Sequence, residues 1–172
     1  AYQIIVGDDS LEVVNNKGKI WDSGKQHSEQ MLVTYAGKEL RPFTKYYWKV
    51  RAWDKDWVEV SSCVSTFETG MMKMSNWQGA WIGDGRDIHY RPAPYFRKVF
   101  EANKKIKSAR AYIAVAGLYE LYINGEKIGN HCLDPLYTRF DRRNFYVTYD
   151  VTSQLKEGRN AIGVLLGNGW YN

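Results

Sequence analysis

Residues 40–52 read LRPFTKYYWKVRA. From Tyr46 to Ala52, aromatic and aliphatic residues occupy every second position, and Lys49 and Arg51 lie between them. Side chains that alternate with a period of two point to opposite faces of an extended chain, which is typical of a half-buried β-strand. We therefore expect a strand over residues 46–53, with its apolar side facing a core.

Short strands of this kind are expected along most of the chain, and no segment shows sustained helical periodicity. Asn124-Gly125 lies between two apolar runs and predicts a β-hairpin, because both residues tolerate the positive φ of a type I′ turn. Many short strands separated by turn residues predict an all-β fold built of sandwiches. The other expected strands are residues 2–6, 31–35, 63–67, 95–100, 108–116, 119–123, 126–130, 144–150 and 160–166, and residues 10–14 are expected to form one helical turn.

The composition bounds the classes of partner. The chain has 172 residues, of which 44% are hydrophobic and 25% charged, an ordinary balance for a globular protein. The net charge is +5, but the basic residues are scattered among acidic ones, so we expect no nucleic-acid partner. No run approaches the roughly 18 apolar residues of a membrane span, so none is expected.

The cysteines and histidines do not form a recognisable site. Cys63 and Cys132 are far apart in the sequence, which argues against a disulfide framework or a zinc set, and we expect both to be small buried hydrophobes. His27, His89 and His131 are isolated and lack metal-ligand spacing. No phosphate-binding glycine loop is present either. We therefore expect neither a metal nor a cofactor.

The stretch at residues 40–52 resembles fibronectin type III domains, in which Leu-x-Pro-x-Thr-x-Tyr precedes alternating apolar residues that end in Val-x-Ala. All the spaced positions match here, from Leu40 to Ala52. The resemblance implies that the hydroxyl of Tyr46 bonds back to the upstream backbone, as in a tyrosine corner. It also implies a fibronectin type III-like sandwich over residues 1–70, whose first strand is expected to be missing.

A second resemblance covers most of the remaining chain. The segments WQGAWI (77–82), FRKVF (96–100), GLYELYING (117–125) and NAIGVLLGNGWY (160–171) are similar, in this order, to the N-terminal region of bacterial α-L-rhamnosidases of glycoside hydrolase family 78. The resemblance implies a galactose-binding-like jelly-roll β-sandwich over residues 95–172, incomplete at its C-terminal end. Residues 71–94 would form a linker and a Trp-containing connecting segment.

In that family, an (α/α)6 barrel downstream supplies the acid and base carboxylates and cleaves terminal α-L-rhamnosides with inversion, which requires two carboxyl groups with room for a water between them. The resemblance implies that this chain carries no catalytic residue and scaffolds the barrel of the same polypeptide. It also implies a contact with a rhamnose-containing glycan, and a periplasmic or extracellular parent enzyme. Two alternatives stay open: a free-standing carbohydrate-binding or cell-surface adhesion module, and an accessory domain of another glycosidase.

Two stretches are candidates for contact with a carbohydrate or with another domain. The first is the polar and aromatic loop at residues 134–143, and the second lies near the end of the chain. Aromatic and arginine side chains of rigid shape suit either task, although loop packing would explain them as well. Outside these stretches, we expect Asp150 to cap a turn and Glu120 to be exposed or ion-paired, with a sugar-facing role as the alternative. The candidate residues are Asp134, Tyr137, Asp141, Arg142, Trp170 and Tyr171.

Overall fold

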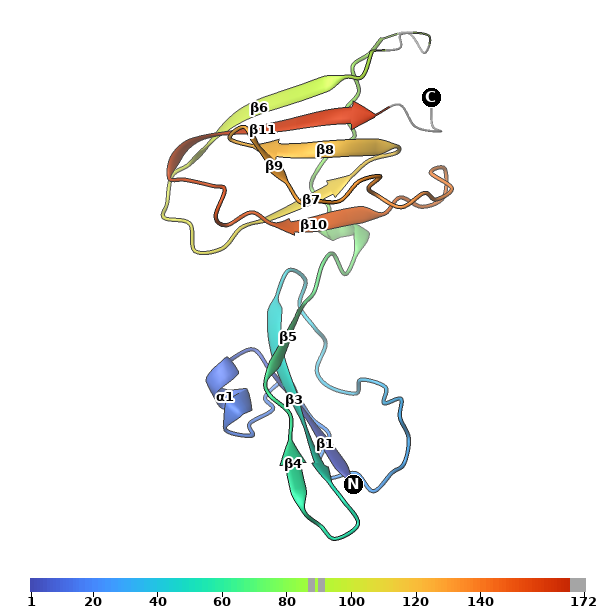
Figure 1. Cartoon of the computed structure of the whole chain (residues 1–172), viewed down its shortest axis with the longest axis vertical. Helices are drawn as coiled ribbons and strands as arrows, with labels where there is room; N and C mark the ends of the chain where they lie inside the picture. The colour runs from blue at the N-terminus through green and yellow to red at the C-terminus, as the bar shows by residue number, and fades with distance from the viewer. Residues whose placement is uncertain (87–88, 90–91, 168–172) are drawn as a thin grey trace. The chain divides into compact units, whose positions relative to one another are not determined.

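The computed structural model describes residues 1–86, 89 and 92–167. The chain divides into two compact units, Ala1–Ala80 and Trp81–Asn172, called here unit 1 and unit 2 (Figure 1). The division falls inside the connecting segment expected at residues 71–94. Every described strand pair is antiparallel, and the described helices are two short turns, which confirms the all-β fold class. Neither of these turns has the length or the hydropathy that a bilayer-spanning helix needs.

Unit 1 contains one sheet among its described residues, with strand order β2-β1-β3-β4. β3 is the strand predicted at residues 46–53. β4 pairs with the last residues of β3, and β5 pairs with its first residues. The elements are β1 (Tyr2–Gly7), α1 (Ser10–Val14), β2 (Trp21–Asp22), β3 (Lys45–Trp53), β4 (Glu59–Ser61), β5 (Ser65–Glu68) and the 3-10 turn η1 (Met74–Asn76).

The two faces of this sheet differ, as the alternation of β3 predicts. Ile4 of β1 lies opposite Val50 of β3, and these residues belong to an apolar face. The other face packs against α1, where Val13 is fully buried. Lys49 lies on that face and is itself buried, and its ammonium group donates a hydrogen bond to the carbonyl oxygen of Val14 at 2.9 Å. The free carbonyl at the end of the short helix thus satisfies a buried cation.

Two expectations for connecting segments are wrong. Residues 31–35 pair with no described strand, and Met31 and Leu32 are 103% and 87% exposed. An apolar run forms a strand only where a neighbour completes its backbone hydrogen bonds, and the described sheet offers it none. Cys63 and Cys132 are both exposed, not buried, because they lie in the connections that follow β4 and β9, and connections run over the surface.

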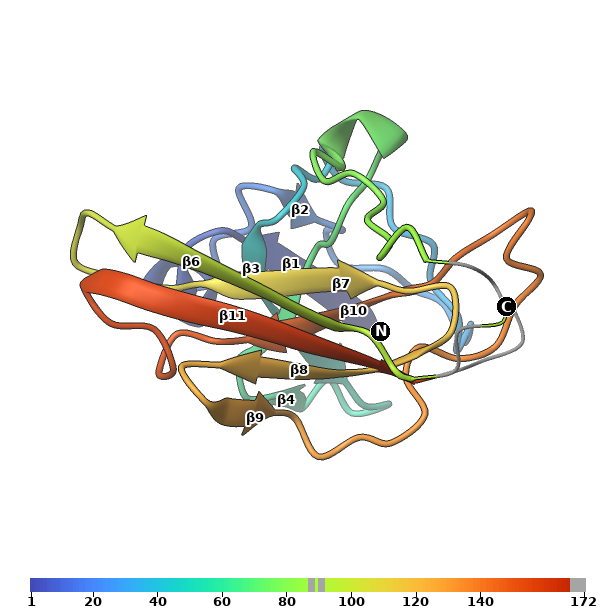
Figure 2. The same cartoon turned by 90° about the horizontal axis from the view of Figure 1, so that it is seen from above.

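The described part of unit 2 contains two antiparallel layers, a four-stranded sheet of order β6-β11-β8-β9 and the pair β10-β7 (Figure 2). Between them lies a core of Tyr119, Leu121, Ile123, Ile128 and Val151. The six strands correspond, within a few residues, to the six predicted in this half of the chain. They are β6 (Tyr95–Ala102), β7 (Arg110–Ala114), β8 (Leu118–Ile123), β9 (Glu126–Ile128), β10 (Tyr146–Asp150) and β11 (Gly158–Gly167).

The predicted turn at Asn124-Gly125 joins β8 to β9, and both residues have positive φ, 53° and 89°. The side chain of Asn124 also accepts a hydrogen bond from the backbone N–H of Ala161 at 2.9 Å and donates one to Asn160 Oδ1 at 2.9 Å. Asn160 is 1% exposed and donates in turn to the carbonyl oxygen of Lys156 at 2.7 Å. These hydrogen bonds therefore fix the turn against the start of β11.

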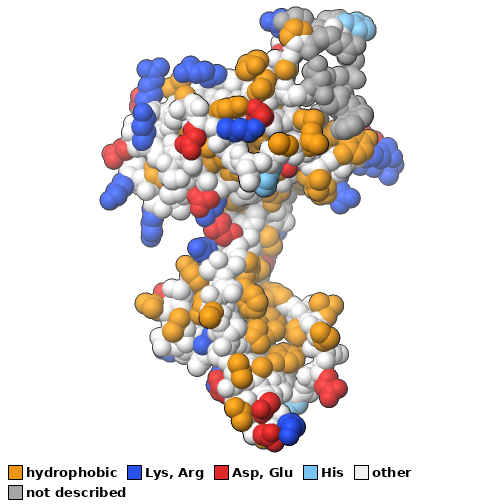
Figure 3. Space-filling view, viewed as in Figure 1, with side chains coloured by type: hydrophobic (Ala, Val, Ile, Leu, Met, Phe, Trp, Pro, Cys, Tyr) orange, Lys and Arg blue, Asp and Glu red, His pale blue; other side chains and the backbone are white. Residues whose placement is uncertain are grey.

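Charged side chains of both signs are interspersed on the face of the molecule drawn in Figure 3. On unit 1 the same view shows hydrophobic side chains gathered together. The exposed hydrophobic residues of unit 1 include Val58 and Val60, at 58% and 67%. The surface thus combines scattered charge with local apolar areas.

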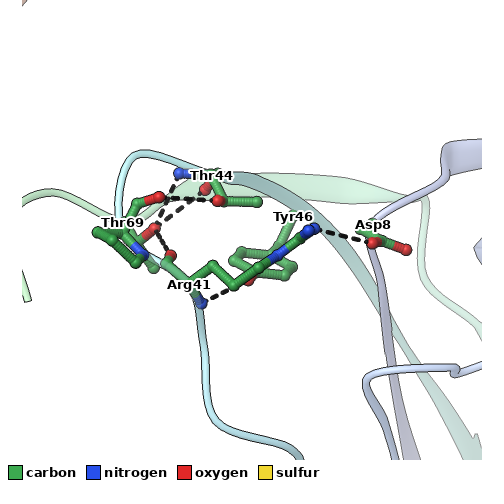
Figure 4. A network of polar contacts seen from close by, with 6 residues as sticks. Asp8, Arg41, Thr44, Tyr46 and Thr69 are labelled. Carbon is green, nitrogen blue, oxygen red and sulfur yellow. Dashed lines mark hydrogen bonds and ion pairs between the residues drawn. The ribbon is translucent and has the colours of Figure 1, made fainter.

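The corner that precedes β3 confirms the predicted role of Tyr46 (Figure 4). Tyr46 is 1% exposed, and its hydroxyl oxygen accepts a hydrogen bond from the backbone N–H of Arg41 at 2.9 Å. Thr69 closes the other side: its hydroxyl donates to the carbonyl oxygen of Arg41, and it accepts from the backbone N–H of Thr44 at 3.0 Å. Arg41 also pairs with Asp8 at 3.1 Å. The corner thus joins the end of β5 to the start of β3.

Candidate functional site

Four of the six predicted site residues lie on one loop of unit 2, which connects β9 to β10 at residues 129–145 and is called here the distal loop. They are Asp134, Tyr137, Asp141 and Arg142. The other two, Trp170 and Tyr171, lie outside the described residues. The distal loop is therefore the part of the prediction that the structure can describe.

Strand register places the distal loop at the end of unit 2 where β11 finishes. Gly167, the last residue of β11, lies opposite Leu118 at the start of β8. β9 runs antiparallel to β8, so the chain leaves β9 towards that same end. The loop then returns into β10, whose first residue, Tyr146, lies opposite the last residue of β7. In Figure 2 the loop and the end of β11 lie at the same end of unit 2.

Asp134 is anchored to the core by a chain of hydroxyl groups. The hydroxyl of Tyr149 donates to Asp134 Oδ2 at 3.2 Å, and the hydroxyl oxygens of Tyr149 and Tyr119 lie 3.0 Å apart. Because Tyr149 has one proton to donate, Tyr119 must be the donor between the two tyrosines. His131 Nδ1 lies 2.9 Å from the same Asp134 oxygen. The carboxylate is thus held by one half-buried strand residue and one loop residue.

Burial keeps the hydroxyl groups of both tyrosines protonated, so that both can donate hydrogen bonds. Tyr119 is 8% exposed, and burial is the main reason that its pKa lies well above the usual value, with the hydrogen bond to Tyr149 acting in the same direction. Burial also raises the pKa of Tyr149. Removal of a buried hydroxyl proton would leave a poorly solvated charge next to Asp134. The anchor is therefore a stable neutral chain that ends on a carboxylate.

The start of the loop fits closely around this anchor. Gly129 has a φ of 77°, and a Cβ at this position would lie 2.7 Å from Cε1 of Tyr149. Only glycine combines that backbone conformation with that close approach to the ring. Leu133 also has a positive φ, 63°, although it is not glycine. Such a conformation costs about 1–2 kcal/mol in a residue with a side chain, so the surrounding contacts must hold it.

The second half of the loop is braced by Asp141. Arg139 donates two hydrogen bonds to this carboxylate, at 3.1 and 2.7 Å, and they are the main reason that the pKa of Asp141 is lowered. The backbone N–H groups of Arg142 and Arg143 both donate to the carbonyl oxygen of Arg139, at 2.8 and 2.9 Å. The backbone of the loop therefore closes on itself in a compact turn, in which Arg142 takes part through its N–H group.

Beside and between the two braces, the loop presents apolar side chains to the solvent. Leu133, Leu136 and Tyr137 are 70%, 72% and 64% exposed. The ring of Tyr137 meets that of Phe140 edge to face, with centroids 5.5 Å apart. A braced loop with an apolar tip loses little conformational entropy when it docks, and this suits a contact surface. Among the described residues, no three His, Cys, Asp or Glu side chains gather as a metal site would require.

Residue patterns alone did not reveal the residues that hold this loop. His131, Tyr119 and Tyr149 anchor it, and none of them was a predicted site residue. A signal was present, because Tyr119 shares the inward face of β8 with Leu121 and Ile123, and a buried tyrosine needs a partner for its hydroxyl. Asp150 and Glu120 follow the expectations. Asp150 accepts from the backbone N–H of Thr152 at 3.0 Å, and Glu120 is paired with Lys127.

Comparison with known protein families assigns both units. A family model described as a Rha78A-like, N-terminal immunoglobulin domain matches residues 1–73. A second, described as the alpha-L-rhamnosidase N-terminal domain, matches residues 104–172. Immunoglobulin and fibronectin type III domains share a sandwich architecture, so the first match agrees with the resemblance of residues 40–52.

Individual relatives match nearly the whole chain. An alpha-L-rhamnosidase of Formosa agariphila is 38% identical and matches 99% of this chain, which covers 20% of that protein. The solved structure of the alpha-L-rhamnosidase from Dictyoglumus thermophilum has a TM-score of 0.91 and 46% identity, over 99% of this chain and 21% of that one. The alfa-L-rhamnosidase from Aspergillus terreus gives 0.80 and 32%, over 99% and 20%. The chain thus spans about a fifth of the length of these relatives.

Proposed function

The chain belongs to the α-L-rhamnosidase family, whose N-terminal region it represents, and we propose that it supports a catalytic region of the same polypeptide through the distal loop. The observation that carries the proposal is the apolar tip of a braced loop at the end of unit 2 where β11 finishes. The last residue of β11 and this loop are at the same end of unit 2. A domain attached there meets the loop at high effective concentration, so even a small contact surface is occupied.

The proposed contact is made by the exposed residues of the loop, and its two carboxylates have a different task. Leu136 and Tyr137 provide apolar surface, and Arg142 adds a cation at the edge. Asp134 and Asp141 each have a partner within the loop, His131 and Arg139, which suits them for bracing and leaves the acid and base roles to carboxylates elsewhere in the polypeptide. Trp170 and Tyr171, which follow β11, are included in the proposed contact on the strength of the sequence alone.

The proposed activity of the longer polypeptide is the removal of terminal α-L-rhamnose from glycans or glycosides. Its support is the family and the relatives, which are named as α-L-rhamnosidases and extend well beyond the length of this chain. The proposal gives this chain a scaffolding role in that reaction, and a rhamnose-containing glycan would be the substrate of the whole protein.

The test replaces Leu136 by Ser in the longer polypeptide and compares it with Leu11→Ser, in α1 of unit 1. The two leucines are 72% and 70% exposed, so they are matched in this structure. Burial of a leucine contributes about 1.5–3 kcal/mol, so Leu136→Ser should lower the melting temperature and reduce hydrolysis of an aryl α-L-rhamnoside, whereas Leu11→Ser should change neither.

Equal behaviour of the two variants would refute the docking role of the loop. Absence of hydrolysis in the unsubstituted polypeptide would refute the proposed activity, and the melting temperatures would still decide the docking role. The two parts of the proposal are thus tested separately.

A further inference from the structure

The outward face of the four-stranded sheet in unit 2 carries a second group of aromatic and charged side chains, separate from the distal loop. In β8, Tyr119, Leu121 and Ile123 are buried in the core, so Glu120 and Tyr122 point outward. Residues directly opposite each other on neighbouring strands share a face, so the register of the sheet identifies the rest of the group.

Two rows cross this face. In the first, Tyr95 of β6 lies opposite Leu165 of β11, which lies opposite Glu120. In the second row, the residues of the four strands are, in order across the sheet, Arg97, Gly163, Tyr122 and Lys127. Tyr95 is 79% exposed. The visible face of unit 2 in Figure 3 likewise shows hydrophobic, acidic and basic side chains next to one another.

Gly163 leaves a gap in the middle of the second row. A Cβ at this position would have its nearest neighbours at 3.7 Å, in Tyr122, and at 3.8 Å, in the backbone of Phe96, which are ordinary van der Waals distances, so a small group can lie over the strand without displacing either. Arg97 and Tyr122 lie on the two strands that flank β11. Two strand spacings separate their backbones, about 9.6 Å. The sheet therefore has a flat floor of backbone between a cation and an aromatic ring.

The ring of Tyr122 is fixed in place. Its hydroxyl donates to Glu120 Oε2 at 2.6 Å, and Lys127 pairs with the other oxygen of the same carboxylate. These two bonds, that of Lys127 first, lower the pKa of Glu120, so its charge is present at neutral pH and offset by Lys127. Glu120 and Lys127 thus hold the ring of Tyr122 on one side of the gap, and neither of them pairs with the cation on the other side.

Arg97 is that cation. It is exposed, and among the described residues it has neither an ion-pair nor a hydrogen-bond partner. Since Glu120 and Lys127 offset each other, the two rows carry one uncompensated positive charge. A guanidinium group binds a carboxylate through two parallel N–H···O bonds, which a neutral hydroxyl cannot reproduce.

We propose that this face binds an acidic sugar unit of a glycan, with the pyranose ring over Gly163 and against Tyr122, and the sugar carboxylate on Arg97. The charge of the rows selects the ligand: a neutral sugar would leave Arg97 unpaired, and a nucleic acid would need a continuous basic surface, which Glu120 interrupts. The site does not involve the distal loop. The glycan-binding role is therefore independent of the docking role, and each can be refuted without the other.

The experiment titrates the 172-residue chain by calorimetry with trigalacturonate and with D-glucuronate, and with the methyl ester of trigalacturonate as the uncharged control. Binding of a free acid, weaker at higher salt and at least tenfold tighter than binding of the ester, is expected. Arg97→Ala should weaken it at least tenfold, and Gly163→Leu, which fills the floor, should abolish it.

Arg159→Ala is the matched control, because Arg159 is an exposed arginine on the same side of β11 as Gly163, opposite Glu101 of β6. It should bind as the unsubstituted chain does. Circular dichroism shows that each variant is folded before it is titrated. Failure of both acids to bind at millimolar concentration would overturn the proposal. Equal affinity for acid and ester, or equal loss in Arg97→Ala and Arg159→Ala, would also overturn it.

Discussion

Replacement of Tyr149 by Phe tests whether the distal loop is held by the hydroxyl chain that runs from the core to Asp134. The substitution removes one oxygen and keeps the ring that contacts Gly129. Two hydrogen bonds are lost, the one that Tyr149 donates to Asp134 at 3.2 Å and the one that it accepts from Tyr119 at 3.0 Å.

The expected cost follows from the burial of these groups. Tyr119 is 8% exposed, so its hydroxyl would lose its acceptor without gaining water in exchange. An unsatisfied buried hydroxyl costs about 1–3 kcal/mol, and the lost bond to a carboxylate adds to this. We expect a loss of about 2 kcal/mol in the free energy of unfolding, or roughly 10 °C in the melting temperature of a domain of this size.

The assay is native-state hydrogen exchange of the amides in β7 and β10, which reports on unit 2 independently of unit 1. Tyr122→Phe is the control, because it removes a hydroxyl that contacts a carboxylate on the outward face, and surface changes usually stay within about 0.5 kcal/mol. If the two variants lose the same stability, the hydroxyl chain does not anchor the loop. Peptides of residues 130–145 should also exchange faster in Tyr149→Phe than in the unsubstituted chain.

Two further predictions concern the stability of unit 2. Burial raises the pKa of both Tyr119 and Tyr149 above the usual value of 10.0, so above about pH 10 the unfolded chain loses protons that the folded chain keeps. Urea denaturation should therefore show the free energy of unfolding falling as the pH rises from about 10, and falling less steeply in Tyr149→Phe; an identical slope would contradict this reason. Asn160→Ala should cost about 3 kcal/mol, because the buried amide joins Lys156, Gly158 and Asn124, whereas Asn15→Ala, which removes one exposed side-chain bond, should cost little. Thermal denaturation of the two variants measures both losses of stability, and equal losses would contradict the prediction.

Where a local pattern fixes the conformation, the sequence was a reliable guide. The alternation in residues 46–53 predicted β3, and Asn124-Gly125 predicted a turn whose two φ angles are indeed positive. Tyr46 forms the expected corner bond. In each case the cause lies within a few residues, in the period of the side chains or in the φ that a residue tolerates.

Prediction failed where the outcome depends on residues far away in the sequence. The run at residues 31–35 has strand composition, but a strand also needs a neighbour, and composition does not say whether one is present. Cys63 and Cys132 have apolar side chains, but their positions in connecting segments expose them. The stretch 134–143 was recognised as a loop of interest, whereas its anchors lie at Tyr119 and Tyr149, on strands from other parts of the sequence.

The two proposed surfaces of unit 2 use its sheet in different ways, and this separates their consequences. The distal loop depends on the inward residues Tyr119 and Tyr149, so a change there is transmitted through the core. The outward rows rest on Arg97, Gly163 and Tyr122, whose side chains are not part of that core. A sheet with a period of two carries two independent sets of residues on the same strands, one for stability and one for recognition. Glycan binding and support of a neighbouring domain can therefore be altered one at a time in this unit.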